Sequence, residues 1–250
     1  MTPTTYQRVW LVVLLVTQLH WRPGYQDKPG LSLWGNAQMS TAEQTKSQAT
    51  RKTILNVAAA EIYQNGFRST GLNEILSKTG LTKGAFYHHF RSKAELGLAV
   101  AQEIIDGTIR ELWIKPLQRA NAGVEVLQST LQYAMAANNT KTVSSGCPLC
   151  NLAQEMANQD ENICAALRHT LDDWLQQITN VLKHDQEIGR IRSNVDCEQS
   201  AYFILSSLQG AIGLAKPYHS PAPFRASMRG LIDYLDGLKT QPALSEPTVN

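Results

Sequence analysis

The sequence predicts an all-α fold, and three observations support this prediction. Apolar residues recur at intervals of three and four through most of residues 50–239, which is the period of an amphipathic helix. No stretch of useful length alternates between apolar and polar residues as a half-buried strand would. Three helix start signals, at Thr70, Thr82 and Ser92, follow one another so closely that the helices there are expected to be short.

The first expected helix covers residues 50–64, and Gly66 ends it. Phe67, which comes directly afterwards, is expected to pack back into a small three-helix core. One face of this helix is apolar, and its residues are Ile54, Leu55, Ala58 and Ile62.

Two further helices are expected on either side of Thr79-Gly80-Leu81, where a glycine permits a left-handed turn. Thr70 is predicted to open the first of them and Thr82 the second, which gives helix-turn-helix geometry. In the second helix, Phe86 and Phe90 face inward while polar and basic side chains project from the other side. A helix tip of this kind fits the major groove of DNA.

Ser92 and Glu95 have the spacing of a capping box. In this motif the Ser92 hydroxyl accepts from the Glu95 N–H, and the Glu95 carboxylate reaches back to the Ser92 N–H. The helix that begins there is expected to continue towards Leu112, because no Gly/Ser-rich break appears before Pro116. Such a rigid helix would carry a shift in the second half of the chain to the helix-turn-helix.

Residues 49–100 resemble the DNA-binding domain of the tetracycline-repressor family of bacterial regulators. The resemblance rests on ILNVAAAEIYQNGF, on TGLTKGAFYHHF with its Gly-x-x-Tyr-x-x-Phe spacing, and on SKAELG. It implies two sets of contacts with DNA. Bases or the groove floor would face Thr82, Lys83, Gly84 and Ala85, and phosphates would be held by Thr70, Tyr87, His88 and Lys93.

The residue types agree with these implied roles. Lys93 lies in the first turn of a helix, where the backbone N–H groups and the dipole favour an anion. Tyr87 offers a hydroxyl donor, and Gly84 lets the backbone approach closely. The operator sequence does not follow, because Lys83 can contact guanine or a phosphate and Ala85 can touch only a thymine methyl group.

Charge is divided unevenly along the chain. Residues 46–93 contain eight Lys or Arg against two Glu, a net charge of +6. Residues 94–250 contain twelve basic and seventeen acidic residues, a net charge of −5. A basic head on an acidic body fits a polyanionic partner for the head only.

Four regions are expected along the chain: an extension (1–45), the helix-turn-helix domain (46–97), a helical ligand-binding and dimerisation domain (98–239) and a flexible tail (240–250). Residues 9–16 form an apolar run, far shorter than the roughly 20 residues that span a bilayer, and no cleavage site follows. We therefore expect translation to start at Met39 and the protein to be cytoplasmic with no membrane partner. The alternative is that this run is a membrane anchor.

The second domain is predicted to contain helices at residues 124–137, 148–158, 161–184, 198–216 and 224–239, with loops at 138–146 and 218–223. The last two helices have broad apolar faces, and Gly210 and Gly213 allow close approach, so we expect them to form a homodimer interface. In the family that the chain resembles, these helices form a four-helix bundle with their copies. The apolar residues are Ala201, Ile204, Leu205, Leu208, Ala211, Ile212 and Ala215, then Phe224, Met228, Leu231, Ile232, Leu235 and Leu238.

The sequence Gly-Cys-Pro-Leu-Cys opens one of these helices. Pro148 at the first helical position places Cys147 at the N-cap and Cys150 near the third position, where the positive end of a helix lowers a thiol pKa. The pair is a candidate redox or electrophile sensor. The alternative is a packing role, since a Gly-Cys pair recurs at this place in similar regulators. A zinc site is disfavoured because no further spaced ligands are present.

Aromatic, sulfur and polar residues of the middle helices suit the lining of a ligand cavity as a set, although each taken singly is more typical of the core. They are Trp113, Tyr133, Met135, Met156, His169 and Trp174.

Together these patterns predict a homodimeric repressor that binds a palindromic DNA operator and responds to a small-molecule effector, with no cofactor, no metal and no catalytic activity. The main rival is a thiol-disulfide redox protein built on Cys147 and Cys150, although the βαβ context of such motifs is missing. A third interpretation is a sensor or scaffold that has lost DNA binding.

Overall fold

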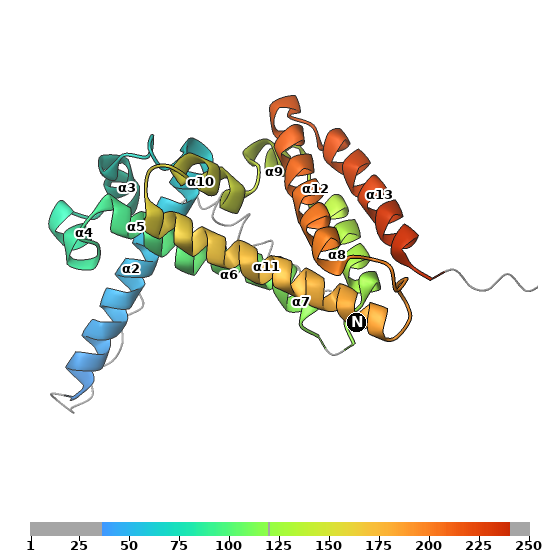
Figure 1. The fold of residues 1–250 in the computed structure, drawn as a ribbon. Coiled ribbons are helices and arrows are strands. Elements are labelled where there is room, and N and C mark those ends of the chain that lie inside the picture. The colour runs from blue at the N-terminus through green and yellow to red at the C-terminus, as the bar shows by residue number, and fades with distance from the viewer. Residues whose placement is uncertain (1–36, 120, 241–250) are drawn as a thin grey trace, which may run out of the picture. The chain divides into compact units, whose positions relative to one another are not determined.

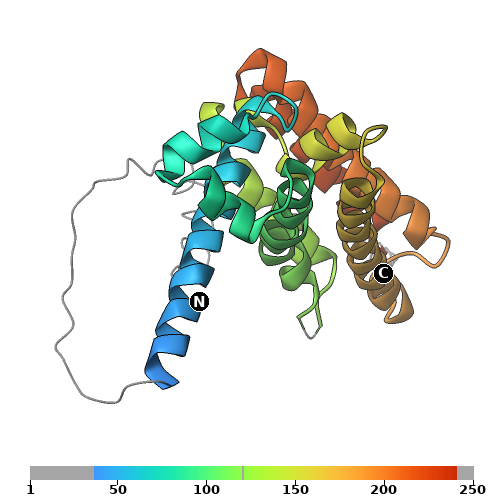
Figure 2. The same cartoon turned by 90° about the vertical axis from the view of Figure 1, so that its left-hand side faces the viewer.

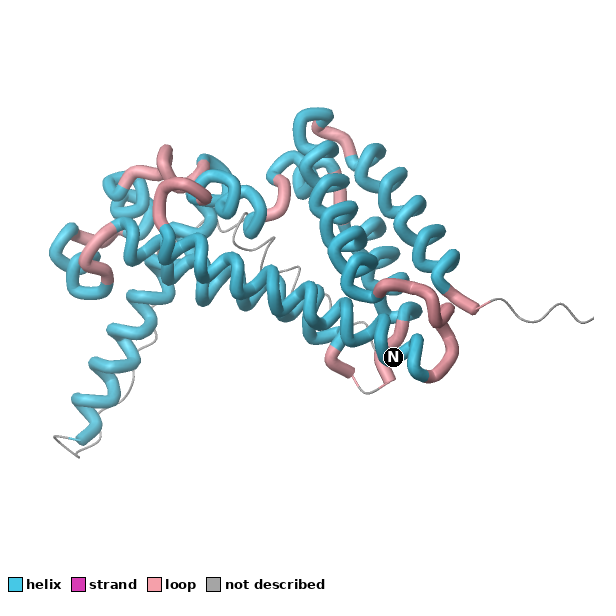
Figure 3. The backbone as a smooth tube through the Cα atoms, in the orientation of Figure 1, coloured by secondary structure: helices cyan, strands magenta, loops and turns pink. Residues whose placement is uncertain are grey.

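The computed structural model describes residues 37–119 and 121–240, which form helices and short connections with no β-strand (Figure 3). The all-α prediction is confirmed for this part of the chain. Two compact units are present. The head unit contains the described residues up to Thr108 together with Leu152–Ala166, and the body unit contains Ile109–Asn151 and the chain from Leu167 onwards. The head unit therefore includes a segment that the sequence assigned to the second domain.

Four helices begin the head unit: α2 (Ala37–Asn65), α3 (Leu72–Thr79), α4 (Lys83–His89) and α5 (Lys93–Ala99) (Figure 1). Helix α2 starts well before residue 50, where the first helix was expected. Its early residues include good helix formers, and neither Gly nor Pro interrupts them. Most of the predicted extension, up to residue 36, lies outside the described residues.

The predicted core of the head unit is confirmed. Phe86 and Phe90 are 0% and 1% exposed, and the predicted apolar face of α2 is buried with them. Helix α3 packs on α2, as Figure 2 shows. Phe67 packs on α5 at Gly97, where an added Cβ would collide with the Phe67 ring and lie 3.1 Å from Ile163 Cδ1.

The helical backbone that starts at α5 continues without a break, as predicted. It includes two wide π-helical stretches that the sequence did not reveal. Arg51 of α2 holds the first of them through a bidentate ion pair with Glu103, at 2.5 and 2.7 Å. The successive segments are η1 (Val100–Ile105), α6 (Asp106–Ile109), η2 (Arg110–Ile114) and α7 (Lys115–Leu117).

The remaining helices are close to those predicted, with two corrections. The expected loop at 138–146 contains a short helix, because the Asn139 side chain accepts from Lys141 N and Thr142 N and closes a capping box. The expected loop at 218–223 is reduced to two residues, because Ser220 caps a helix that starts with Pro221. The helices are α8 (Val124–Ala137), α9 (Thr140–Ser145), α10 (Pro148–Met156), α11 (Glu161–Glu187), α12 (Cys197–Tyr218) and α13 (Pro221–Leu238).

Helices α12 and α13 lie side by side in the body unit, and α8 packs on α13 (Figure 1). Most of the apolar residues expected at a dimer interface are buried here inside one chain, so their assignment to that interface is wrong. An apolar stripe on a helix indicates that this face is buried, but it does not show whether the same chain or a second copy covers it. The large apolar side chains of α12 that remain exposed are Tyr202, Phe203, Leu214 and Tyr218.

Within the described residues, no helix is long and apolar enough to cross a membrane. The apolar run at residues 9–16 lies outside that part of the chain.

Candidate DNA-binding surface, cavity and thiol pair

The turn between α3 and α4 has the predicted helix-turn-helix geometry. Gly80 ends α3 in the left-handed region, at φ 68°, and its N–H donates to Leu76 O. Thr82 then caps α4 by accepting from Ala85 N at 3.2 Å. Both ends are fixed by contacts within four residues of the chain, which explains why the local sequence could predict them.

Helix α4 presents a polar tip above a buried base. Tyr87 is 52% exposed, while Phe86 of the same helix is fully buried against Phe90 and the rest of the core. Ala85 is half-buried. We call the exposed residues of this tip the recognition surface: Thr82, Lys83, Gly84, Tyr87 and His88.

Thr70 does not have the role expected for it. The N-cap of α3 is Gly71, with no side-chain cap. The Thr70 side chain is fully buried, and its hydroxyl donates to Gly66 O at 2.7 Å. Thr70 therefore closes the turn between α2 and α3, and its hydroxyl is not placed to meet a phosphate.

Lys93 also has a partner inside the protein. Its Nζ donates to Arg68 O at 3.2 Å and lies 4.7 Å from the centre of the Phe67 ring. Burial lowers the pKa of Lys93, and the nearby charge of Glu155 opposes that shift. The ammonium group therefore joins the start of α5 to the turn that precedes α3.

The capping box at α5 is only half as predicted. The Ser92 hydroxyl accepts from Glu95 N at 3.0 Å, as expected. The Glu95 carboxylate instead accepts from Arg91 N, at 2.7 Å.

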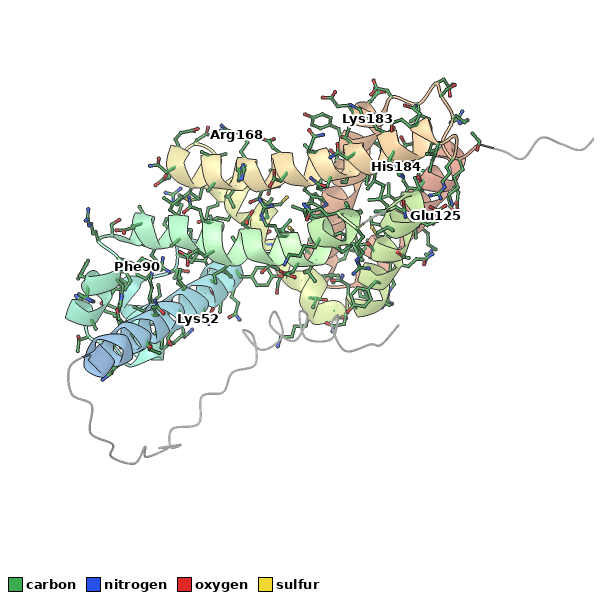
Figure 4. The ribbon with its side chains drawn as sticks, turned by 90° about the horizontal axis from the view of Figure 1, so that it is seen from below. Lys52, Phe90, Glu125, Arg168, Lys183 and His184 are labelled. Atoms are coloured by element: carbon green, nitrogen blue, oxygen red, sulfur yellow. The ribbon has the colours of Figure 1, made fainter. Side chains whose placement is uncertain are left out.

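Ion pairs within the head unit neutralise part of its basic charge. Arg51 pairs with Glu103, and Lys78 lies 2.5 Å from the buried carboxylate of Glu61. Burial lowers the pKa of His89, and the charges of His88 and Arg51 add to this effect. Exposed basic residues remain on α2 and on the recognition surface, among them Lys52 (Figure 4).

Trp113 and Trp174 stack in the body unit with ring centroids 5.1 Å apart, and both line a cavity of about 20 Å³. Such a space holds about one water molecule. Thr130 also lines the cavity, and its hydroxyl donates to Val126 O at 2.7 Å. The other lining residues are Leu117, Leu127, Leu131, Ile178, Ile204, Leu205 and Leu208.

Of the predicted ligand residues, only Trp113 and Trp174 line this cavity, and a ligand-binding role for the others stays a prediction. Met156 belongs to the head unit. Tyr133 is 36% exposed and does not line the cavity. The His169 side chain is 72% exposed, with its Nε2 4.0 Å from Asp173 Oδ2. Helical spacing identifies residue types that suit a cavity but not which helices converge on it.

Cys147 lies at the start of α10, where its carbonyl accepts from Asn151 N at 2.9 Å. The thiol is buried, and Cys150 is half-buried. Hydrogen bonding from the Cys150 thiol lowers the pKa of Cys147 to about 7, and the N–H groups of Cys150 and Leu149 add to this effect against burial. The pKa of Cys150 is raised by the same contact, so Cys147 ionises first.

The sequence did not predict a role for Gln209 of α12 at the thiol pair. Its side-chain amide is buried and makes no well-aligned hydrogen bond to any described residue. It is nevertheless near enough to Cys147 to help lower the pKa of that thiol. A buried amide without a partner is costly, and a charged or oxidised sulfur at Cys147 would supply one.

Two family models match the chain. The model described as "Bacterial regulatory proteins, tetR family" matches residues 54–100, and the model described as "Tetracyclin repressor-like, C-terminal domain" matches residues 123–231. Together they cover more than half of the chain, including the helix-turn-helix and most of the body unit.

Individual proteins give the same result. The "Transcriptional regulator AcuR" of Cereibacter sphaeroides is 26% identical over 71% of this chain and 81% of that protein. The "HTH-type transcriptional repressor DhaR" of a Mycobacterium species is 24% identical over 65% of this chain and 80% of its own length. A crystal structure of a TetR transcriptional regulator from Chloroflexus aurantiacus is 26% identical, covers 78% of this chain and 98% of its own, and superposes with a TM-score of 0.69.

Proposed function

The chain belongs to the tetracycline-repressor family of DNA-binding transcriptional regulators, and from this premise we propose that it is a cytoplasmic repressor. It binds a palindromic operator as a homodimer and leaves the DNA when a small molecule binds the body unit. No catalytic role is proposed for it.

The recognition surface carries the DNA-binding part of this proposal. A short helix with a buried aromatic base and an exposed Lys83-Gly84 tip has the size and polarity that a major groove accepts. Tyr87 and His88, exposed on the same helix, are suited to phosphates. Lys93 donates one N–H to Arg68 O, and because an ammonium group has three donors it can also donate to a phosphate.

Selection from a random duplex library tests this function. The protein should select a palindrome with half-sites one helical turn apart, and log K should fall linearly with log salt concentration by about 0.9 per phosphate neutralised. Lys83→Ala should weaken binding and, where Lys83 holds a phosphate, reduce the slope by about 1. Lys141→Ala, which removes an exposed charge from the body unit, is the matched control. Failure of the wild type to select any sequence would contradict the proposal.

The exposed side of α12 supports the homodimer. Phe203, Leu214 and Tyr218 are 49%, 52% and 66% exposed, which is unusual for side chains of this size on one helix of a single chain. A second copy of α12 and α13 would cover them.

The cavity beside Trp113 and Trp174 is the proposed effector site. At about 20 Å³ it must open before any effector larger than water can enter. Opening would move α11 and the helix that leads from α5, and this movement is the proposed signal. Operator DNA should then weaken effector binding by the same factor by which the effector weakens DNA binding.

The thiol pair supports a second trigger, namely chemical modification of Cys147. A peroxide would convert the two thiols into a disulfide and be reduced to water, and an unsaturated aldehyde would form a thioether with the Cys147 thiolate. Either product would perturb the start of α10. Wild type, Cys147→Ser and Cys150→Ser should be compared for operator binding before and after each treatment. Equal release of all three, or no release of wild type, would leave Cys147 with a packing role.

A further inference from the structure

Glu155 contacts the head unit through both of its carboxylate oxygens, and none of the roles above uses this contact. One carboxylate oxygen, Oε2, accepts from Phe67 N at 2.7 Å, and the other, Oε1, accepts from Arg68 N at 2.7 Å. Both donors belong to the turn between α2 and α3. Glu155 itself comes from α10, nearly ninety residues later in the chain.

The surroundings of this turn fit the carboxylate closely. Gly66 has φ +84°, and an added Cβ there would lie 3.1 Å from Glu155 Oε2. On the other side of the turn, Lys93 donates to Arg68 O and feels the charge of Glu155. Two backbone N–H groups, one backbone carbonyl and one ammonium group thus form a single polar cluster around Glu155, which we call the Glu155 clamp.

The clamp bears on DNA binding through α3. The turn that it holds ends at Thr70, whose hydroxyl closes on Gly66 O, and α3 begins two residues later. Helix α3 is the first helix of the helix-turn-helix and leads directly into the recognition surface. We propose that Glu155 is a positioning residue for DNA binding, which keeps the turn before α3 in the conformation that the operator requires.

This role also makes the head dependent on α10. The first half of that helix, which begins beside Cys147, belongs to the body unit, and its second half, with Glu155, belongs to the head unit. A small rotation or shift of α10 would carry the carboxylate away from both N–H groups, because hydrogen bonds weaken steeply with distance and angle. This consequence rests on the proposed function, whereas the clamp itself does not.

The expected effect follows from a change in populations. When only a fraction of the heads have the correct turn, the apparent dissociation constant rises in inverse proportion to that fraction. Losing the charge-assisted hydrogen bonds to the N–H groups of Phe67, which is buried, and Arg68, which is exposed, should lower operator affinity about tenfold in Glu155→Ala. Glu155→Gln keeps one acceptor and should lower it less. Because Glu155 is an anion, it neutralises no phosphate, so the salt dependence should stay as in wild type.

The experiment compares full-length wild type, Glu155→Ala, Glu155→Gln and the matched control Glu187→Gln, which changes an exposed carboxylate at the end of α11. Operator affinity is measured at several salt concentrations, and hydrogen exchange of residues 66–71 is measured without DNA. Circular dichroism and urea unfolding establish that each variant is folded. The isosteric Gln variant keeps the test valid if the Ala variant does not fold.

The proposal requires faster exchange at Phe67 and Arg68, weaker operator binding and an unchanged salt slope in both Glu155 variants, with Glu187→Gln like wild type. Faster exchange with unchanged affinity would overturn the positioning role, and unchanged exchange would overturn the clamp. If wild type selects no operator, both the proposed function and the positioning role are contradicted. The hydrogen exchange of Phe67 and Arg68 still tests whether the clamp exists.

Discussion

Gly84 lies at the second position of α4, where an added Cβ would meet nothing closer than the Thr82 hydroxyl oxygen at 3.9 Å. Nothing in the fold therefore requires a glycine there, and a helix is more stable with alanine. The proposed close approach of the backbone to the groove floor would account for a glycine at this position.

Gly84→Ala should accordingly separate stability from DNA binding. The free energy of unfolding should rise by up to about 1 kcal/mol. Operator affinity should fall roughly tenfold, which corresponds to about 1.4 kcal/mol. Urea unfolding and fluorescence anisotropy with labelled operator measure the two quantities. Unchanged or tighter binding would show that the backbone at Gly84 stays away from DNA.

Cys147 is the second residue whose behaviour follows from its immediate neighbours. Its pKa is lowered to about 7 by the Cys150 thiol, and the thiolate is the reactive form. The rate of alkylation by iodoacetamide should therefore rise with pH, pass its midpoint near pH 7 and level off above it. Cys150→Ala removes the donated hydrogen bond and should move that midpoint to higher pH.

Mass spectrometry of the alkylated cysteines measures these rates, with Cys197 as the internal control. Burial raises the pKa of Cys197, so its rate should still be rising at pH 8. A shared midpoint for Cys147 and Cys197 would exclude thiolate stabilisation at the start of α10.

Among the helices, α5 shows how one glycine fixes an element in place. Gly97 lies inside this helix, and the Phe67 ring occupies the space that a side chain would need. Gly107, inside α6, has nothing within 4 Å of an added Cβ. The two glycines thus share a helical setting and differ in packing.

Gly97→Ala should lower the free energy of unfolding by about 1–3 kcal/mol, because a rigid ring and Ile163 must move to accept the methyl group. Gly107→Ala should leave stability unchanged or raise it by up to about 1 kcal/mol. Urea unfolding of both variants against wild type gives the comparison. Equal changes in the free energy of unfolding at the two sites would show that the Phe67 ring moves aside without destabilising the protein.

At the scale of the whole molecule, the proposed homodimer depends on the exposed apolar side of α12. Phe203 and Leu214 are each about half exposed, and charges placed there would be buried without partners in a dimer. Ile188, which follows α11, is 50% exposed and provides an apolar control away from α12.

Phe203→Glu together with Leu214→Glu should give a folded monomer with little operator affinity, since one head contacts only one half-site. Ile188→Glu should remain a dimer. Analytical ultracentrifugation measures the mass of each variant. A double variant that stays dimeric would place the interface elsewhere.

The local sequence by itself determined much of the fold. The bounds of α8, the left-handed Gly80, the Thr82 cap and the buried Phe86 and Phe90 all follow from contacts within one or two turns. These contacts form whenever the backbone is helical, so residue type and spacing are sufficient to predict them. The exposed tip of α4 follows in turn, because burying the two rings leaves the opposite side outside.

Only the tertiary structure decided which distant groups meet. The cap on Phe67 and Arg68 comes from Glu155, Lys93 turns to Arg68 O, and the amide of Gln209 lies near Cys147. Of the predicted ligand residues, two line the cavity with leucines and isoleucines that the sequence did not distinguish from other core residues. Such contacts depend on how helices pack across many residues of chain. Periodicity reveals that a face is buried or a carboxylate is available, but the partner is chosen only when the helices are in place.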